Sequence, residues 1–185
     1  MTGPTTLDSR SGLPSGLDHL LLRHPRSGWP THPELGPLTT FWLDRHLAFR
    51  DMLHRLRKDA EAAADGTLDP ADHAGTLSRI GGTFLQQIHD HHTIEDDHYF
   101  PRLVALAPTL ERGFAILDAD HHALHDRLDG LARAANAVLR GGGPGEAARL
   151  ADDLSRLEGF LNRHLTDEED LVVPIILDVG EARLT

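Results

Sequence analysis

HHTIEDDHYFP at 91–101 and HLTDEEDLVVP at 164–174 are two copies of one pattern in this chain. In each copy a histidine is followed four residues later by a glutamate and ten residues later by a proline. Residues four positions apart lie on the same face of an α-helix, about one turn from each other. Each copy therefore directs an imidazole and a carboxylate toward one point, which is how a helix offers two ligands to a metal ion.

Further histidines stand at helical spacing around the two copies. His121 and His125 form another pair four residues apart, and His46 precedes all of them. Imidazole ligands favour transition metals over magnesium or calcium. The chain has no cysteine, which excludes thiolate ligands, iron–sulfur clusters and disulfides. The candidate metal ligands are His46, His91, Glu95, His121, His125, His164 and Glu168.

These seven candidate ligands lie on helical stripes that are otherwise apolar. Burying imidazoles and carboxylates without partners would cost several kcal/mol, so these side chains require partners, and metal ions would supply them all together. Seven ligands exceed the needs of one ion and do not saturate two octahedral ions. Two metal ions bridged by the carboxylates, with one position open, agree with this number. Two other registers stay open, namely His92 with Asp96 in place of His91 with Glu95, and Glu169 in place of Glu168.

The apolar periodicity predicts four long helices joined by short loops. No segment shows the alternation typical of strands. The fold class is therefore all-α, an up-down-up-down four-helix bundle with an N-terminal extension. The extension is 1–37, rich in Pro, Gly and Ser with a short helix over 17–22, and the metal-binding domain is 38–180. The helices are expected at about 39–65, 70–100, 108–140 and 150–180. Gly81–Gly82 is a weak point of the second helix, and Pro101 either ends or kinks it.

The formal net charge of −11 disfavours nucleic acids and anionic membrane surfaces as partners. The first residues lack the basic and apolar run of a signal peptide, and no apolar stretch approaches the roughly 20 residues that span a bilayer. We therefore expect a cytoplasmic protein with no nucleic-acid or membrane partner. The sequence does not indicate an oligomeric state.

The chain resembles the hemerythrin family, specifically the bacterial hemerythrin-like or HHE cation-binding proteins, from about Thr39 to Leu177. The resemblance rests on Arg45-His46-Leu47, the stretch 91–101, Asp120-His121 with His125, and the stretch 164–174. It implies a non-haem di-iron centre, with two iron ions (Fe²⁺/Fe³⁺) joined by a bridging oxo or hydroxo group. In this assignment His121, His125 and His164 hold one iron, His46 and His91 hold the other, and Glu95 and Glu168 bridge them.

The resemblance also implies reversible binding of dioxygen, or of another diatomic such as nitric oxide, at the iron held by His46 and His91. The two halves of the chain correspond in outline, since His46 precedes His91 by 45 positions and His121 precedes His164 by 43. In this comparison Arg50 stands at the position of His125, and it cannot ligate, which agrees with an open position. We expect a binding protein for storage, delivery or sensing rather than an enzyme. The alternatives are a di-iron redox enzyme (an oxidase, a peroxidase or a nitric oxide reductase), an iron-handling or oxidative-stress protein, and a stabilising zinc or manganese site. Tyr99 could reach the iron or only close the bundle end.

Overall fold

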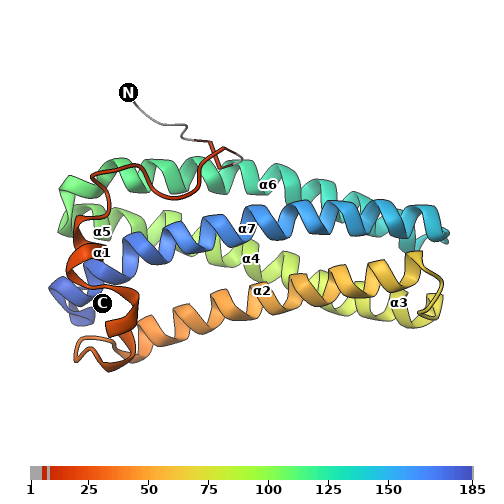
Figure 1. The fold of residues 1–185 in the computed structure, drawn as a ribbon, viewed down its shortest axis with the longest axis horizontal. Helices are drawn as coiled ribbons and strands as arrows, with labels where there is room; N and C mark the ends of the chain where they lie inside the picture. Colours follow the sequence, from red (N-terminus) through yellow and green to blue (C-terminus); the bar gives the residue numbers. More distant parts are fainter. Residues whose placement is uncertain (1–5, 8, 185) are drawn as a thin grey trace. The chain divides into compact units, whose positions relative to one another are not determined.

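The structure, a computed structural model, describes residues 6–7 and 9–184 (Figure 1). These residues form helices and turns without any strand, which confirms the predicted all-α helical bundle. The helices are α1 (His19–Arg23), α2 (Pro37–Ala64), α3 (Pro70–Thr76), α4 (Gly82–Ile94), α5 (Phe100–Leu106), α6 (Glu111–Leu139) and α7 (Pro144–Val179). Three 3₁₀ turns cover Arg26–Thr31, Pro108–Leu110 and Glu181–Arg183.

The ends of the long helices follow local sequence signals. The Asp69 side chain accepts a hydrogen bond from the Ala71 N–H over 2.8 Å at the start of α3, and Pro70 occupies the first turn. This is the N-cap arrangement expected from the sequence. Gly141 follows α6 with a φ of 97°, a left-handed conformation that terminates helices and that glycine adopts without steric cost.

The helix expected at 70–100 is a run from α3 to α5 that contains two π-helical turns, Leu77–Gly81 and Glu95–Tyr99. The sequence predicted that Pro101 ends or kinks this helix, and the structure continues through it into α5. In the turn before the proline, the Phe100 N–H donates to the carbonyl of Glu95, five residues earlier. Proline clashes with the carbonyl four residues back in a regular helix, so a wider turn at this place relieves the clash.

The chain forms two compact units, each built from segments of all the long helical runs. Of the described residues, those within Met1–His46, His92–His121 and Asn162–Thr185 form unit 1. Those within Leu47–His91 and His122–Leu161 form unit 2. Most of the candidate metal ligands belong to unit 1.

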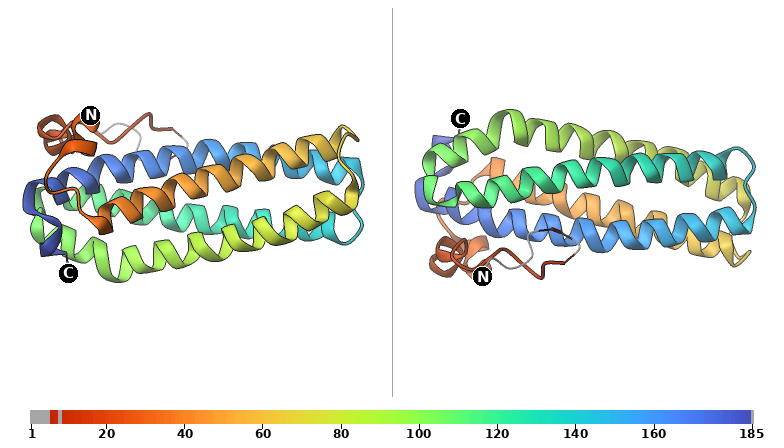
Figure 2. Two further views of the ribbon diagram at one scale, coloured as in Figure 1. Left: turned by 90° about the horizontal axis from the view of Figure 1, so that it is seen from below. Right: turned by 90° about the horizontal axis from the view of Figure 1, so that it is seen from above.

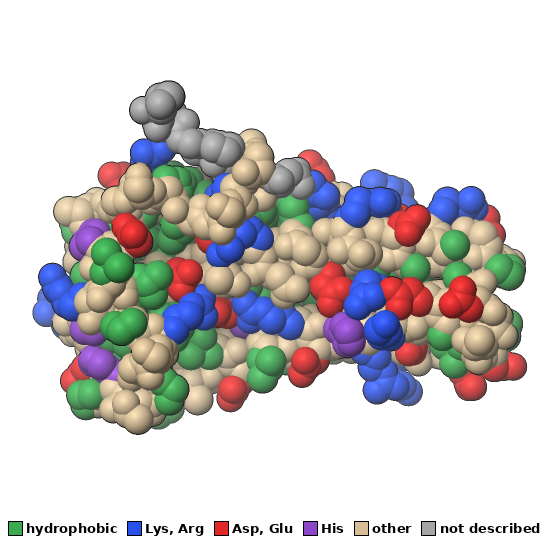
Figure 3. Space-filling view, viewed as in Figure 1, with side chains coloured by type: hydrophobic (Ala, Val, Ile, Leu, Met, Phe, Trp, Pro, Cys, Tyr) green, Lys and Arg blue, Asp and Glu red, His purple; other side chains and the backbone are tan. Residues whose placement is uncertain are grey.

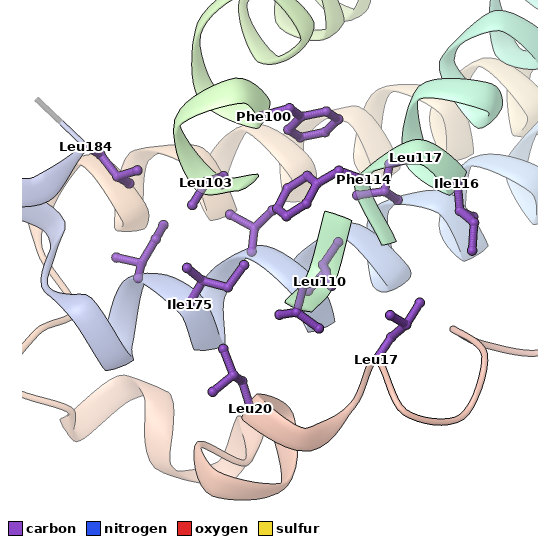
Figure 4. Packing of buried hydrophobic residues seen from close by; sticks show 13 residues of the cluster. Leu17, Leu20, Phe100, Leu103, Leu110, Phe114, Ile116, Leu117, Ile175 and Leu184 are labelled. Carbon is purple, nitrogen blue, oxygen red and sulfur yellow. The ribbon is translucent and has the colours of Figure 1, made fainter. Parts of the chain in front are cut away.

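The core of unit 1 includes side chains from the expected N-terminal extension. Leu17 and Leu20 point into the cluster formed by Leu110, Phe114 and Ile175, with α7 behind them (Figure 4). The helix α1 lies beside the C-terminal part of α7 (Figure 2). Residues 1–5 and 8 of the expected extension lie outside the described residues, and the rest of it contributes to the core of unit 1.

Unit 2 has an aliphatic and aromatic core of its own. Phe49 and Phe84 meet edge to face with ring centroids 6.3 Å apart. At its surface Arg57 Nε donates to Glu158 Oε2 over 2.5 Å, and His54 lies 3.2 Å from the other oxygen of the same carboxylate. Acidic and basic side chains lie next to one another over the face of the chain drawn in Figure 3. None of the described helices combines the length and apolarity needed to cross a lipid bilayer.

Candidate metal centre

Two groups of metal-ligating side chains lie buried in unit 1. His92, His121 and His164, here called the histidine triad, each bring a ring nitrogen within 4.8 Å of the others. His46, Glu95 and Glu168, here called the carboxylate group, also place one donor atom each within 4.8 Å of one another. The donors come from α2, from the run α4–α5, from α6 and from α7, so every long helical run contributes to unit 1 at this place.

The two glutamates of the carboxylate group also lie next to histidines of the triad. Oε2 of Glu168 is 3.7 Å from Nε2 of His46 and 3.5 Å from Nε2 of His164, one turn earlier on α7. Oε2 of Glu95 is 3.8 Å from Nε2 of His121. Each glutamate therefore belongs to the carboxylate group and also lies close to a histidine of the triad, which is the position that a bridging ligand would occupy.

These separations suit shared metal ions. Two donors about 2.1 Å from one transition-metal ion lie about 3.0 to 4.2 Å apart for angles from 90° to 180° at the metal. The three nitrogen-to-oxygen distances fall inside this range. Nε2 of His121 and both oxygens of Glu168 are buried and have no hydrogen-bond partner among the described residues. Buried polar atoms normally have a partner, and a cation would provide it.

Carboxylates hold the outer nitrogen of three of these histidines. Nδ1 of His46 lies 3.0 Å from Glu169 Oε1, and Nδ1 of His121 lies 2.8 Å from Asp96 Oδ1. Nδ1 of His164 lies 3.4 Å from a carboxylate oxygen, Oδ2 of Asp120. A carboxylate that accepts the Nδ1 proton leaves Nε2 as the free electron-pair donor, which is the arrangement typical of metal-bound histidines.

The negative charges of the two buried glutamates, Glu95 and Glu168, require a nearby positive charge. Burial, reinforced by the neighbouring carboxylate of Glu95, holds the pKa of Glu168 well above its ordinary value. Trp42 donates its indole N–H to Oε1 of Glu95 over 2.5 Å. Placing two carboxylates together in the interior is unfavourable without positive charge, and a divalent or trivalent ion between them would supply that charge.

Within unit 1 the structure brings together five of the seven residues expected from the sequence, which are His46, Glu95, His121, His164 and Glu168. The other two belong to unit 2. His91 is half-buried, with its ring centroid 5.1 Å from that of Phe49. His125 is exposed, with its ring centroid 6.2 Å from that of His89.

His92 occupies the place beside His121 and His164 that the family resemblance implied for His125. Its ring stacks on His121 with centroids 4.1 Å apart and meets His164 edge to face at 5.4 Å. Of the registers left open by the sequence, the structure places Asp96 and Glu169 behind the histidines, where each contacts an Nδ1 atom. The doublet His91–His92 was the available signal, because neighbouring helical residues point about 100° apart and can serve two ions.

The sequence patterns did not predict the hydrogen bonds by which Trp42, Asp120 and Arg10 support the candidate ligands. The Asp120–His121 step is visible in the sequence, but the structure pairs Asp120 with His164, which lies on another helix. Arg10, in the N-terminal segment, donates hydrogen bonds to Asp120 and Asp167. Such contacts join residues far apart in the chain, so spacing along the sequence carries no sign of them.

Comparison with protein families agrees with this site. The model of the hemerythrin family, described as the hemerythrin HHE cation binding domain, matches residues 38–176. Comparison with curated proteins gave no match, and neither did comparison with solved structures. The matched range covers most of the chain and includes every candidate metal ligand described above. The chain therefore belongs to the hemerythrin family, as a protein with an HHE cation-binding domain.

Proposed function

We propose that this protein holds two iron ions (Fe²⁺/Fe³⁺), joined by a bridging oxo or hydroxo group, and binds dioxygen or another diatomic such as nitric oxide reversibly. The histidine triad holds one ion, His46 and His91 hold the other, and Glu95 and Glu168 bridge them. His91 enters this set from the sequence, because it directly precedes His92 and stands four residues before Glu95. The cytoplasmic location expected from the sequence remains a prediction.

The position of Glu168 is the observation that carries the proposal. One of its oxygens lies within 3.7 Å of Nε2 atoms of two histidines that belong to different groups. A single-metal site would need only one of these contacts. A carboxylate between two sets of imidazoles is the arrangement that supports a pair of ions, and the iron of the hemerythrin family suits such mixed nitrogen and oxygen ligands.

The surroundings of His46 favour binding of a small neutral ligand. The proposed ion at His46 has fewer protein ligands than the ion at the triad, which leaves a position open. His46 is fully buried, and its ring centroid lies 4.5 Å from that of Trp42. A buried ion with an open coordination position can take up a diatomic molecule, and burial limits the access of the water and protons that promote irreversible oxidation.

The visible spectrum of the full chain, loaded anaerobically with Fe²⁺, tests the proposal. Metal analysis comes first, with an expected ratio of two iron ions per chain. We expect a charge-transfer band that appears on exposure to oxygen and disappears when oxygen is removed. A control variant is His98→Ala, which alters an exposed histidine in the same turn as Glu95 and should behave as the wild type.

Each other result contradicts a defined part of the proposal. A ratio of one iron per chain would refute the paired site. A stable zinc or manganese content in protein from its own cells, with no iron uptake, would indicate a purely stabilising site. Rapid bleaching with multiple-turnover consumption of peroxide or nitric oxide would assign the centre to a redox enzyme instead of a reversible carrier or sensor.

A further inference from the structure

The N-terminal segment of unit 1 reaches the candidate metal centre through Arg10. This buried arginine donates to both oxygens of Asp120, over 2.8 Å for the Nη1 bond, and through Nε to Oδ2 of Asp167 over 2.8 Å. Asp120 is also the carboxylate behind Nδ1 of His164. The contacts therefore form a continuous series from Arg10 through Asp120 to a member of the histidine triad.

A second arginine of the same segment makes an equivalent series on the other side. Arg26 donates from Nη1 to Oε2 of Glu169 over 2.8 Å and from Nε to Oδ1 of Asp170 over 2.6 Å. Its Nη2 also donates to the carbonyl of Thr166 over 3.0 Å. The other oxygen of Glu169 lies 3.0 Å from Nδ1 of His46. This series ends at the histidine of the carboxylate group.

The charge on the outer carboxylate affects the histidine in front of it. A carboxylate that accepts the Nδ1 proton orients the ring and increases its basicity toward a metal. A guanidinium bound to that carboxylate draws electron density away from it and fixes its rotamer through two or more hydrogen bonds. An arginine at this place therefore controls both the direction in which the histidine points and the strength with which it donates electrons.

We propose that Arg10 and Arg26 are positioning residues of the metal centre, so that the N-terminal segment sets the metal affinity and the ligand field at His164 and His46. The inference rests on the proposed metal binding by these two histidines. It gives residues 10–26 a role beyond covering the bundle. The segment ties two outer carboxylates that come from different helices, Asp120 on α6 and Glu169 on α7.

The chain provides a matched control within the same segment. Arg23 donates from Nη1 to Oδ1 of Asp178 over 2.5 Å, so it also joins the segment to α7. Asp178 forms hydrogen bonds with Arg23 and His24, and neither of these residues is a proposed metal ligand. Loss of the Arg23 pair removes a similar anchor of the segment without changing a carboxylate that holds a ligand histidine.

Anaerobic titration of the metal-free full chain with Co²⁺ tests the proposal. The variants are Arg10→Gln, Arg26→Gln, Arg26→Lys and Arg23→Gln. The readouts are the Co²⁺ dissociation constant, the visible spectrum of bound Co²⁺ and the thermal unfolding of the metal-free protein. Loss of the fixed carboxylate rotamer should outweigh the gain in carboxylate basicity, so we expect Arg10→Gln and Arg26→Gln to weaken binding about 10- to 100-fold and to shift the Co²⁺ bands. Arg26→Lys keeps the charge but not the guanidinium fork, so it should restore only part of the affinity. Arg23→Gln should stay within about twofold of the wild type.

The possible results separate the two proposals. If the wild type binds no Co²⁺ or Fe²⁺, the proposed function fails and this inference fails with it. If the wild type binds and Arg26→Gln matches Arg23→Gln in affinity and spectrum, only the positioning role is overturned. Arg10 is buried between two aspartates, so Arg10→Gln can fail to fold. Arg26 has a side chain that is 42% exposed, and its variants then decide the question alone.

Discussion

Trp42 donates its indole N–H to Oε1 of Glu95 over 2.5 Å, while the other carboxylate oxygen of Glu95 lies 3.8 Å from Nε2 of His121. The indole also packs beside His46, with ring centroids 4.5 Å apart. One tryptophan thus orients a proposed bridging carboxylate and contacts a proposed ligand. A partly buried tryptophan normally finds an acceptor for its N–H, and here the acceptor belongs to the metal centre.

Replacement of Trp42 by phenylalanine should weaken metal binding. The ring volume is largely kept, but Oε1 of Glu95 loses its donor, and an outer partner of this kind contributes about 10-fold or more to metal affinity. The loss of a hydrogen bond to a buried carboxylate should also lower the free energy of unfolding by about 1–3 kcal/mol. Co²⁺ titration and urea unfolding measure the two effects.

Trp29→Phe is the control for the Trp42 variant. The indole of Trp29 donates to the carbonyl of His24 over 2.7 Å, so this variant also loses a tryptophan hydrogen bond. It should reduce stability and leave the Co²⁺ affinity unchanged. Equal losses of affinity in both variants would mean that the effect arises from general destabilisation and not from Glu95.

Glu168→Gln should separate stability from metal binding. Burial next to Glu95 disfavours the ionised carboxylate of Glu168 in the metal-free protein, so at neutral pH an isosteric amide should raise its free energy of unfolding by about 1–4 kcal/mol. The same change removes the proposed bridge, so the second metal ion should be lost. Unfolding in the presence of a chelator and metal analysis of the loaded protein measure these opposite effects. Glu111→Gln, at an exposed position, is the control, and a destabilised Glu168→Gln protein would contradict the prediction.

His92 and His125 provide a direct test of the ligand set. The structure places the ring of His92 between His121 and His164 and leaves His125 exposed. We therefore expect His92→Ala to lose about one metal ion per chain and His125→Ala to keep both. Metal analysis after loading distinguishes them. The reverse result would restore the assignment that the family resemblance implied.

The sequence predicted the fold well because its signals are local. The aspartate and proline before α3, the glycine after α6 and the apolar periodicity each act within a few residues. They placed the start of α3 at Pro70 and the end of α6 near Gly141 correctly. The sequence predicted an end or a kink at Pro101 but not the π-helical turn before it, because that turn depends on which carbonyl accepts the Phe100 N–H.

The sequence predicted less of the candidate site because the outer contacts are nonlocal. The spacing of His164 and Glu168 placed both on one face of α7, and the structure keeps them 3.5 Å apart. The choice between His92 and His125 depends on the rotation of two helices about their axes, which shifts by about 100° per residue. The hydrogen bond from Arg10 to Asp120 joins residues 110 positions apart in the chain, so the periodicity of the sequence does not predict it.

His73 should make the stability of the metal-free protein depend on pH. This histidine of α3 is buried in unit 2, and neither ring nitrogen has a hydrogen-bond partner among the described residues. Burial lowers the pKa of His73, although Asp59 acts in the opposite direction. The unfolded chain, with a histidine pKa of about 6.5, therefore binds more protons than the folded chain just below that pH.

Protonation of His73 in the unfolded state should thus favour unfolding as the pH falls below about 6.5, with at most about 1.4 kcal/mol lost per pH unit. His73→Leu removes this contribution, so its stability advantage over the wild type should grow from about pH 7.5 to pH 5. Urea unfolding in the presence of a chelator at both pH values measures the difference. His98→Gln, at an exposed position, should follow the wild type. Parallel pH profiles for the wild type and His73→Leu would show that His73 is protonated equally in both states, because only a difference in proton binding between them can tilt the stability curve.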